Sequence, residues 1–129
     1  MKLRNGIVFL VFFVAISCVK SQTEGMALVD VLTFEQKMKE EGVQLIDVRT
    51  PSEYAEGHLA NAVNININDS DFKAKIEVLD KTKPILVYCK SGGRSGRACS
   101  QLKEMGFTTI TDLDGGITDW KAHEKPIEK

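Results

Sequence analysis

The sequence predicts an α/β fold in which helices cover both faces of a mostly parallel sheet. Short apolar, β-favouring runs alternate with segments of helical periodicity, which is the pattern of parallel strands joined by crossover helices. One of these runs ends at Cys89 and passes through a glycine-containing loop into a helical pattern. Ligands of such sheets bind outside the carboxyl ends of the strands. We therefore expect the functional site at Cys89.

The first 17 residues have the features of an export signal. A basic start precedes an apolar run over residues 7–16, which is shorter than the roughly 20 residues of a membrane span but suits a signal-peptide core. Ala15-Ile16-Ser17-Cys18 then resembles a bacterial lipobox, whose cysteine is acylated. We expect an exported bacterial protein, either periplasmic or membrane-anchored as a lipoprotein through Cys18. An ordinary secretory signal and an uncleaved anchor are the alternatives.

The composition of the chain argues against several classes of partner and of fold. Loss of residues 1–17 from the 129-residue chain leaves 15 basic against 18 acidic residues, a net charge of −3. A mildly acidic domain without a basic run argues against nucleic acid as a partner. Three cysteines are too few for a disulfide scaffold. Two distant histidines without a C-x-x-C pair predict no metal site. We expect a monomer without a cofactor.

The segments up to the middle of the chain follow from caps and periodicity. Residues 18–27 are expected to hold the anchor cysteine and a polar tether, and residues 28–125 the folded domain. The expected elements are a strand over Leu28–Leu32, a helix from a Thr33 cap to Glu41, and a strand over Val43–Val48. Thr50, Pro51 and Glu53 then predict a capping box and a short helix that stops at Gly57.

The second half continues the alternation. Its expected elements are a strand over Ala62–Ile67, a helix capped by Asp69 or Ser70, a strand that ends at Tyr88, a helix that stops at Gly106, a strand over Thr108–Leu113, and a closing helix after Gly115-Gly116 that carries Trp120. No internal repeat interrupts this order. One domain is therefore expected.

Cys89 has the surroundings of a nucleophile. A strand, a tight loop and a helix N-terminus direct backbone N–H groups at one small anionic site. With Lys90 and Arg94 in this loop, we expect the pKa of the Cys89 thiol to be lowered, which gives a thiolate near neutral pH. Gly92 and Gly93 are expected to let the N–H groups converge. Arg94 either attracts an anionic substrate or clamps loop carbonyls.

Other reactive side chains have plainer interpretations. Asp47 and Arg49, at the end of a strand, predict a structural ion pair or loop brace. His58 at a turn is expected to be structural, and His123 to be exposed near the tail. Cys99 lies on the packed face of its helical pattern, so a buried core thiol is expected rather than a resolving cysteine.

Three sequence blocks together resemble one protein family. They are Leu45-Ile46-Asp47-Val48-Arg49 with Glu53-Tyr54 and Gly57-His58, then Tyr88-Cys89-Lys90-Ser91-Gly92-Gly93-Arg94-Ser95, and finally Leu113-Asp114-Gly115-Gly116 with Trp120. In this order they resemble the rhodanese-like sulfurtransferases, and the likeness covers nearly all of residues 28–125. It implies a three-layer fold with a five-stranded parallel sheet. It also implies that Cys89 carries a sulfane sulfur as a persulfide.

The resemblance implies a sulfurtransferase whose donor is thiosulfate or a similar small anion and whose acceptor is a thiol, a protein cysteine or cyanide. Lys90, Ser91, Gly92, Gly93, Arg94 and Ser95 would contact the substrate. Two alternatives belong to other classes. Related phosphatases have five residues between cysteine and arginine, whereas only four lie between Cys89 and Arg94, which leaves room for a sulfur atom rather than a phosphoryl group. Non-catalytic rhodanese-fold binding modules typically lack the loop cysteine.

Overall fold

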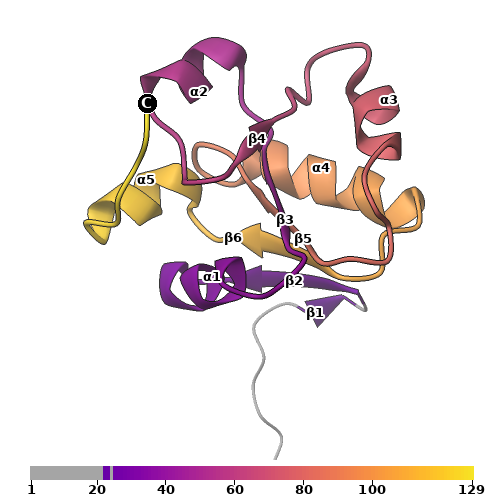
Figure 1. Ribbon diagram of the computed structural model, residues 1–129, viewed down its shortest axis with the longest axis horizontal. Helices are drawn as coiled ribbons and strands as arrows, with labels where there is room; N and C mark the ends of the chain where they lie inside the picture. The colour runs from indigo at the N-terminus through magenta and orange to yellow at the C-terminus, as the bar shows by residue number, and fades with distance from the viewer. Residues whose placement is uncertain (1–21, 24) are drawn as a thin grey trace, which may run out of the picture.

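The structure is a computed structural model, which describes residues 22–23 and 25–129. A sheet with the strand order β1-β2-β6-β5-β3-β4 forms its centre (Figure 1). The strands are β1 (Gln22–Thr23), β2 (Met26–Val29), β3 (Gln44–Asp47), β4 (Val63–Asn64), β5 (Ile85–Tyr88) and β6 (Ile110–Leu113). The five strands β2 to β6 are parallel, and β1 pairs antiparallel with β2. The expected five-stranded parallel sheet is confirmed.

Helices connect the parallel strands and cover both faces of the sheet. They are α1 (Val31–Met38), α2 (Pro51–Glu56), α3 (Phe72–Glu77), α4 (Gly93–Glu104) and α5 (Gly116–Ala122). Side chains of β5 alternate between the two faces, as the pleat of a strand requires. Ile85 and Val87 pack with α3 and α4, while Leu86 and Tyr88 pack with α1 and α5. All four are buried, which is why this strand is a continuous apolar run.

Several expected boundaries were wrong in the first half. The chain leaves β2 at Val29, and α1 begins at Val31 instead of after Thr33. The cap is Asp30, whose carboxylate accepts a hydrogen bond from Thr33 N at 2.8 Å, a stronger arrangement than a Thr33 cap. The tether expected within residues 18–27 was also wrong in part, because Gln22 and Thr23 form the edge strand β1 and β2 already begins at Met26.

The strand expected over Ala62–Ile67 is shorter than predicted. β4 holds only Val63 and Asn64, because beyond them the backbone bonds to β3 lose the regular spacing of a ladder. The expected cap of α3 at Asp69 or Ser70 was wrong. Asp71 is the cap residue and its side chain makes no capping bond, whereas the Asp69 carboxylate accepts from Asn66 Nδ2 at 3.2 Å.

The capping box of α2 is confirmed. Thr50 Oγ1 accepts from Glu53 N at 3.4 Å, and Thr50 N donates to the Glu53 carboxylate at 3.4 Å. Pro51 occupies the first helical position and Gly57 ends the helix. This box holds Glu53 in a defined place near the carboxyl end of the sheet, where its carboxylate also meets the site described below. In the part of the chain that the structure describes, no helix is both long and apolar enough to cross a membrane.

Candidate active site

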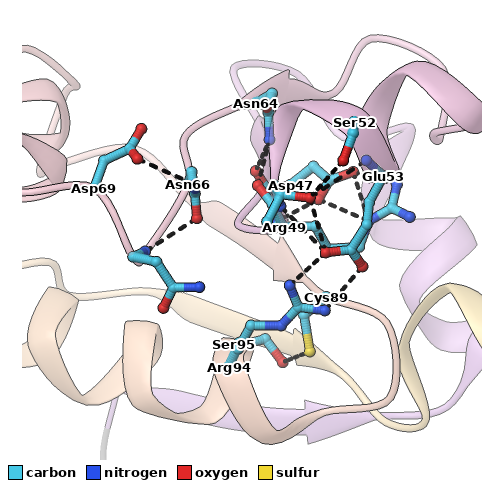
Figure 2. A network of polar contacts seen from close by, with 12 residues as sticks. Asp47, Arg49, Ser52, Glu53, Asn64, Asn66, Asp69, Cys89, Arg94 and Ser95 are labelled. Atoms are coloured by element: carbon cyan, nitrogen blue, oxygen red, sulfur yellow. Dashed lines mark hydrogen bonds and ion pairs between the residues drawn. The ribbon is translucent and has the colours of Figure 1, made fainter.

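Cys89 lies where β5 ends and the chain turns toward α4. Its side chain is 1% exposed. Gly92 N donates a hydrogen bond to Cys89 Sγ at 3.0 Å, and the Ser95 hydroxyl lies 3.4 Å from the same sulfur (Figure 2). Gly92 has φ +123°, a backbone conformation that favours glycine. Gly93 has no positive φ and simply begins α4, so the expectation that both glycines shape the loop was wrong for Gly93.

The pKa of the Cys89 thiol is lowered from its usual value. Burial is the largest contribution and acts to raise it, but hydrogen bonds from the Ser95 side chain and from the backbone N–H groups of Ser95, Gly92 and Ser91 outweigh burial. The expected direction is confirmed. The expected N–H groups do lower this pKa, together with the Ser95 hydroxyl, whereas the expected cations Lys90 and Arg94 are not among its largest causes. The Lys90 side chain is exposed and is not one of these hydrogen-bond donors to the sulfur.

Arg94 forms a bidentate ion pair with Glu53 of α2. The guanidinium donates at 2.7 Å and 2.9 Å to the two carboxylate oxygens, as Figure 2 shows. This hydrogen bonding to Arg94 lowers the pKa of Glu53 to about 2, against burial. The expected clamp on loop carbonyls was wrong, because the guanidinium binds the carboxylate of a distant residue. The attraction of an anionic substrate by Arg94 stays a prediction. Sequence reasoning used Glu53 only as a helix cap and so missed this pair.

The N-terminus of α5 holds the outer side of the Cys89 loop. Ile117 N donates to Cys89 O at 2.9 Å, and Thr118 N donates to Lys90 O at 3.0 Å. Gly116 has φ +57°, and a Cβ there would lie 2.5 Å from both of these carbonyl oxygens. A side chain at this position is therefore excluded both by conformation and by space. The Gly115-Gly116 pair predicted a turn in the sequence, but its contact with the loop was missed.

Asp47 and Arg49 form the expected structural ion pair. Arg49 donates to both carboxylate oxygens of Asp47, at 2.7 Å for the shortest contact, and also to Gly57 O at 2.7 Å. Burial, the largest contribution, acts to lower the pKa of Arg49, but Asp47 outweighs it and the pKa is raised. The pair braces the end of β3 against the end of α2. The guanidinium also lies 5.7 Å from the centre of the Tyr88 ring, which favours cation–π attraction.

The remaining candidates lie away from the Cys89 sulfur or serve the fold. The His58 ring stacks on Tyr54 at 3.8 Å between centroids and makes a 2.9 Å bond to Tyr54 O, so its expected structural role is confirmed. Cys99 is 1% exposed, and burial raises the pKa of its thiol, as expected of a core thiol. His123 is exposed. No cluster of three His, Cys, Asp or Glu suited to a metal occurs within the described residues.

A cavity of about 570 Å³ adjoins the loop. Lys90 lines it from the loop, Glu53 and Glu56 from α2, and Thr118 and Lys121 from α5. The cavity therefore has charged walls of both signs and reaches the residue that follows Cys89. A polar or charged ligand suits such a lining better than an apolar ligand does.

Comparison with known proteins then decides the family. A family model of the rhodanese-like domain matches residues 30–123. The chain belongs to the rhodanese-like domain family. This rhodanese-like domain is similar to the crystal structure of a rhodanese-related protein from Thermoplasma volcanium, with a TM-score of 0.69 and 31% sequence identity over 78% of this chain and 95% of the other.

Curated relatives of this rhodanese-like domain include proteins named as sulfurtransferases. A putative sulfurtransferase of Bacillus subtilis is 41% identical over 87 residues, which are 67% of this chain and 82% of the relative. A thiosulfate sulfurtransferase of Coxiella burnetii is 37% identical over 86 residues, which are 67% of this chain and 78% of the relative. The residues that the family model matches include the Cys89 loop.

Proposed function

We propose that the protein is a sulfurtransferase that moves a sulfane sulfur from thiosulfate or a similar small donor to a thiol or cyanide through a persulfide on Cys89. The contact that carries this proposal is the 3.0 Å hydrogen bond from Gly92 N to Cys89 Sγ. It belongs to a set of donors that lower the pKa of this thiol. Relatives named as sulfurtransferases support the reaction class.

In the first half of the reaction, the Cys89 thiolate attacks the outer sulfur of thiosulfate. A new S–S bond forms to Cys89, the bond between the two thiosulfate sulfurs breaks, and sulfite leaves with the electron pair. The outer persulfide sulfur then carries the negative charge. N–H groups of the loop at residues 91–95 stabilise that charge, because they are fixed before the reaction begins.

In the second half, the thiolate of an acceptor or a cyanide ion attacks the outer persulfide sulfur. The acceptor gains this sulfur, and the Cys89 thiolate is regenerated as the leaving group. No proton transfer by a side chain is needed, because both the nucleophile and the leaving group are anions. Lys90 and Lys121 line the cavity beside the loop and place positive charge near the approach of these anions, although Glu53 and Glu56 add negative charge to the same cavity.

The direct test is intact-mass measurement after incubation with thiosulfate. A sulfurtransferase of this kind gains the mass of one sulfur atom, loses it when cyanide is added, and releases thiocyanate. Cys89→Ser is the control that gains nothing. A wild-type protein whose mass does not change would instead support the alternative of a non-catalytic binding module.

We also propose that the protein is exported and held at a bacterial membrane by an acylated Cys18. This proposal rests on the sequence of the first 18 residues alone, which lie outside the described residues. The multiple acyl chains of a lipoprotein anchor a protein firmly, whereas one chain anchors only marginally.

A further inference from the structure

A carboxyl group lies beneath α4, close to the Cys89 loop but outside the machinery described above. Asp112 belongs to β6, where Ile110 packs with the α3 and α4 face and Leu113 with the opposite face. Because side chains alternate along a strand, Asp112 points to the α4 face. It pairs in register with Val87 of β5 and Leu28 of β2. Cys89 follows Val87 by two residues and points to the same face.

Two buried residues of α4 meet Asp112 from above. Ser95 and Cys99 are four positions apart, so they lie on the same side of the helix, and both are buried against the sheet. The Ser95 side chain interacts with the Asp112 carboxyl and favours its ionised form, while the charge of Asp112 raises the pKa of Cys99. Asp112 Oδ1 is buried and has no hydrogen-bond partner among the described residues, which is costly for a carboxylate oxygen.

Several acceptors surround the Ser95 hydroxyl, which can donate to only one of them at a time. Its hydroxyl carries one hydrogen, and it is fully buried. In the structure it contacts Gly92 O at 3.2 Å and Cys89 Sγ at 3.4 Å. The Asp112 carboxyl on the facing strand is a third group that can compete for this hydrogen, because its Oδ1 is buried without a partner among the described residues. An ionised Asp112 draws the hydrogen toward itself. A protonated Asp112 can instead donate to Ser95 Oγ, which leaves the hydroxyl hydrogen for the anionic sulfur.

We propose that Asp112 is a positioning residue that acts through Ser95 to set how strongly the anionic Cys89 sulfur is hydrogen-bonded. The effect on the thiolate stands by itself, whereas the effect on the persulfide rests on the proposed sulfurtransferase function. When Asp112 is neutral, the hydrogen bond from Ser95 to the anionic sulfur is strengthened. When Asp112 is ionised, that hydrogen bond is weakened, because the carboxylate attracts the Ser95 proton and adds a negative charge near the sulfur. The site thus binds an anionic sulfur better when Asp112 is neutral.

The surroundings of Asp112 raise its pKa, so that it changes charge at mildly acidic pH. Burial, the largest cause, and the charge of Asp114 raise the pKa of Asp112 to about 6, against Ser95 and the Leu113 N–H. The groups that face it are Ser95 and Cys99 from α4 and Asp114 beyond the end of its own strand, while its strand neighbours Leu28 and Val87 are apolar. Near pH 6 the two forms of Asp112 are therefore comparably populated.

The test measures the thiolate directly and needs no sulfur transfer. The full chain is alkylated over a range of pH, and the rate at Cys89 is followed by the mass of its peptide, which separates it from Cys18 and Cys99. Asp112→Asn, which is always neutral and donates through its amide, should raise the Cys89 rate roughly three- to tenfold above about pH 6 and change it little below about pH 5. Glu104→Gln removes an exposed carboxylate at the far end of α4; it is the control and should change the rate less than about twofold.

Ser95→Ala tests whether Asp112 acts on the sulfur through the Ser95 hydroxyl. In that background Asp112→Asn should lose most of its effect, because the proposed coupling passes through the hydroxyl. An undiminished effect would show a through-space charge only and would overturn the role of Ser95, and no effect in either background would overturn the proposal altogether. If Asp112→Asn does not fold, the pH profile of Cys89 alkylation in the wild type tests the proposal instead. It should show an inflection near pH 6 that is absent from Ser95→Ala, and an inflection that persists in Ser95→Ala would overturn the role of Ser95. An unchanged mass with thiosulfate would overturn the sulfurtransferase function and leave this result standing.

Discussion

The backbone of Gly116 lies against the carbonyl oxygen of Cys89, so closely that a Cβ on Gly116 would be 2.5 Å from it. The next residue, Ile117, donates its N–H to the same oxygen at 2.9 Å. Helix α5 thus holds the backbone of Cys89 from outside the loop, while Gly92 N and Ser95 contact its sulfur from inside. A shift of the Cys89 backbone would therefore move the sulfur relative to Gly92 N and Ser95.

Gly116→Ala should therefore damage the site from a position that touches no substrate. The new methyl group pushes the Cys89 and Lys90 carbonyls away, and φ +57° is strained for alanine. We expect a loss of about 1–3 kcal/mol in the free energy of unfolding and at least roughly a tenfold loss of kcat/KM. Denaturant melts and thiosulfate:cyanide assays measure the two quantities.

Gly96→Ala is the matched glycine control. Gly96 lies inside α4, and a Cβ there meets nothing within 4 Å. This variant should keep its activity and gain about 0.5–1 kcal/mol of stability, because alanine favours a helix. Equal damage from both substitutions would contradict the importance of the Gly116 contact.

Cys89→Ser should abolish sulfur transfer and leave the fold intact, because serine cannot form a persulfide and is similar in size. Cys99→Ser should retain activity, since its buried thiol has a raised pKa. Intact mass after thiosulfate treatment and a thiosulfate:cyanide assay check both variants. An active Cys89→Ser beside a dead Cys99→Ser would reverse the assignment of the nucleophile.

Glu53→Gln should change how stability depends on pH. The pKa of Glu53 is lowered from 4.5 to about 2, so its ion pair with Arg94 stabilises the fold above about pH 4.5 and is lost as the pH falls toward 2. Because both side chains are partly exposed, at 22% and 27%, we expect only about 1 kcal/mol at pH 7. Urea melts of wild type and variant should converge near pH 2; a constant difference at every pH would exclude the ion pair as the cause.

The two loop cations should differ in kinetics. Lys90→Gln should raise KM for thiosulfate, and added salt should reduce the difference from wild type, because an exposed charge acts on the approach of the anion. Arg94→Gln should lower kcat as well, since it releases the Glu53 carboxylate near the anionic sulfur. Steady-state assays at several ionic strengths measure both; identical behaviour of the two variants would refute this division.

Cys18→Ala should free the protein from membranes without changing its sulfurtransferase activity. The wild type should remain in the membrane fraction in high salt and leave it in detergent, as acyl chains rather than charges hold it. Fractionation and mass analysis of the N-terminus check this prediction. A soluble wild-type protein with an unmodified N-terminus would leave a freely diffusing exported enzyme.

The sequence by itself determined the features that depend on near neighbours. The Thr50 capping box, the continuous apolar run of β5 and the position of Cys89 at its end all follow from residues a few positions apart. Periodicity and capping carry this information, because the interactions responsible lie within one turn or one strand. The start of α3 was wrong where residues 68–71 are all polar and offer several caps, and the start of α1 was wrong because the apolar Val31 and Leu32 were expected in the preceding strand.

Only the tertiary structure decided which distant groups meet around the Cys89 loop. Arg94 finds Glu53, 41 residues away, and Gly116 closes on the Cys89 carbonyl, because β6 lies beside β5 and brings the start of α5 to the loop. Asp112 comes under Ser95 for the same reason. Periodicity reveals which face of a strand is buried, but the order of the strands in the sheet decides what each buried side chain meets there.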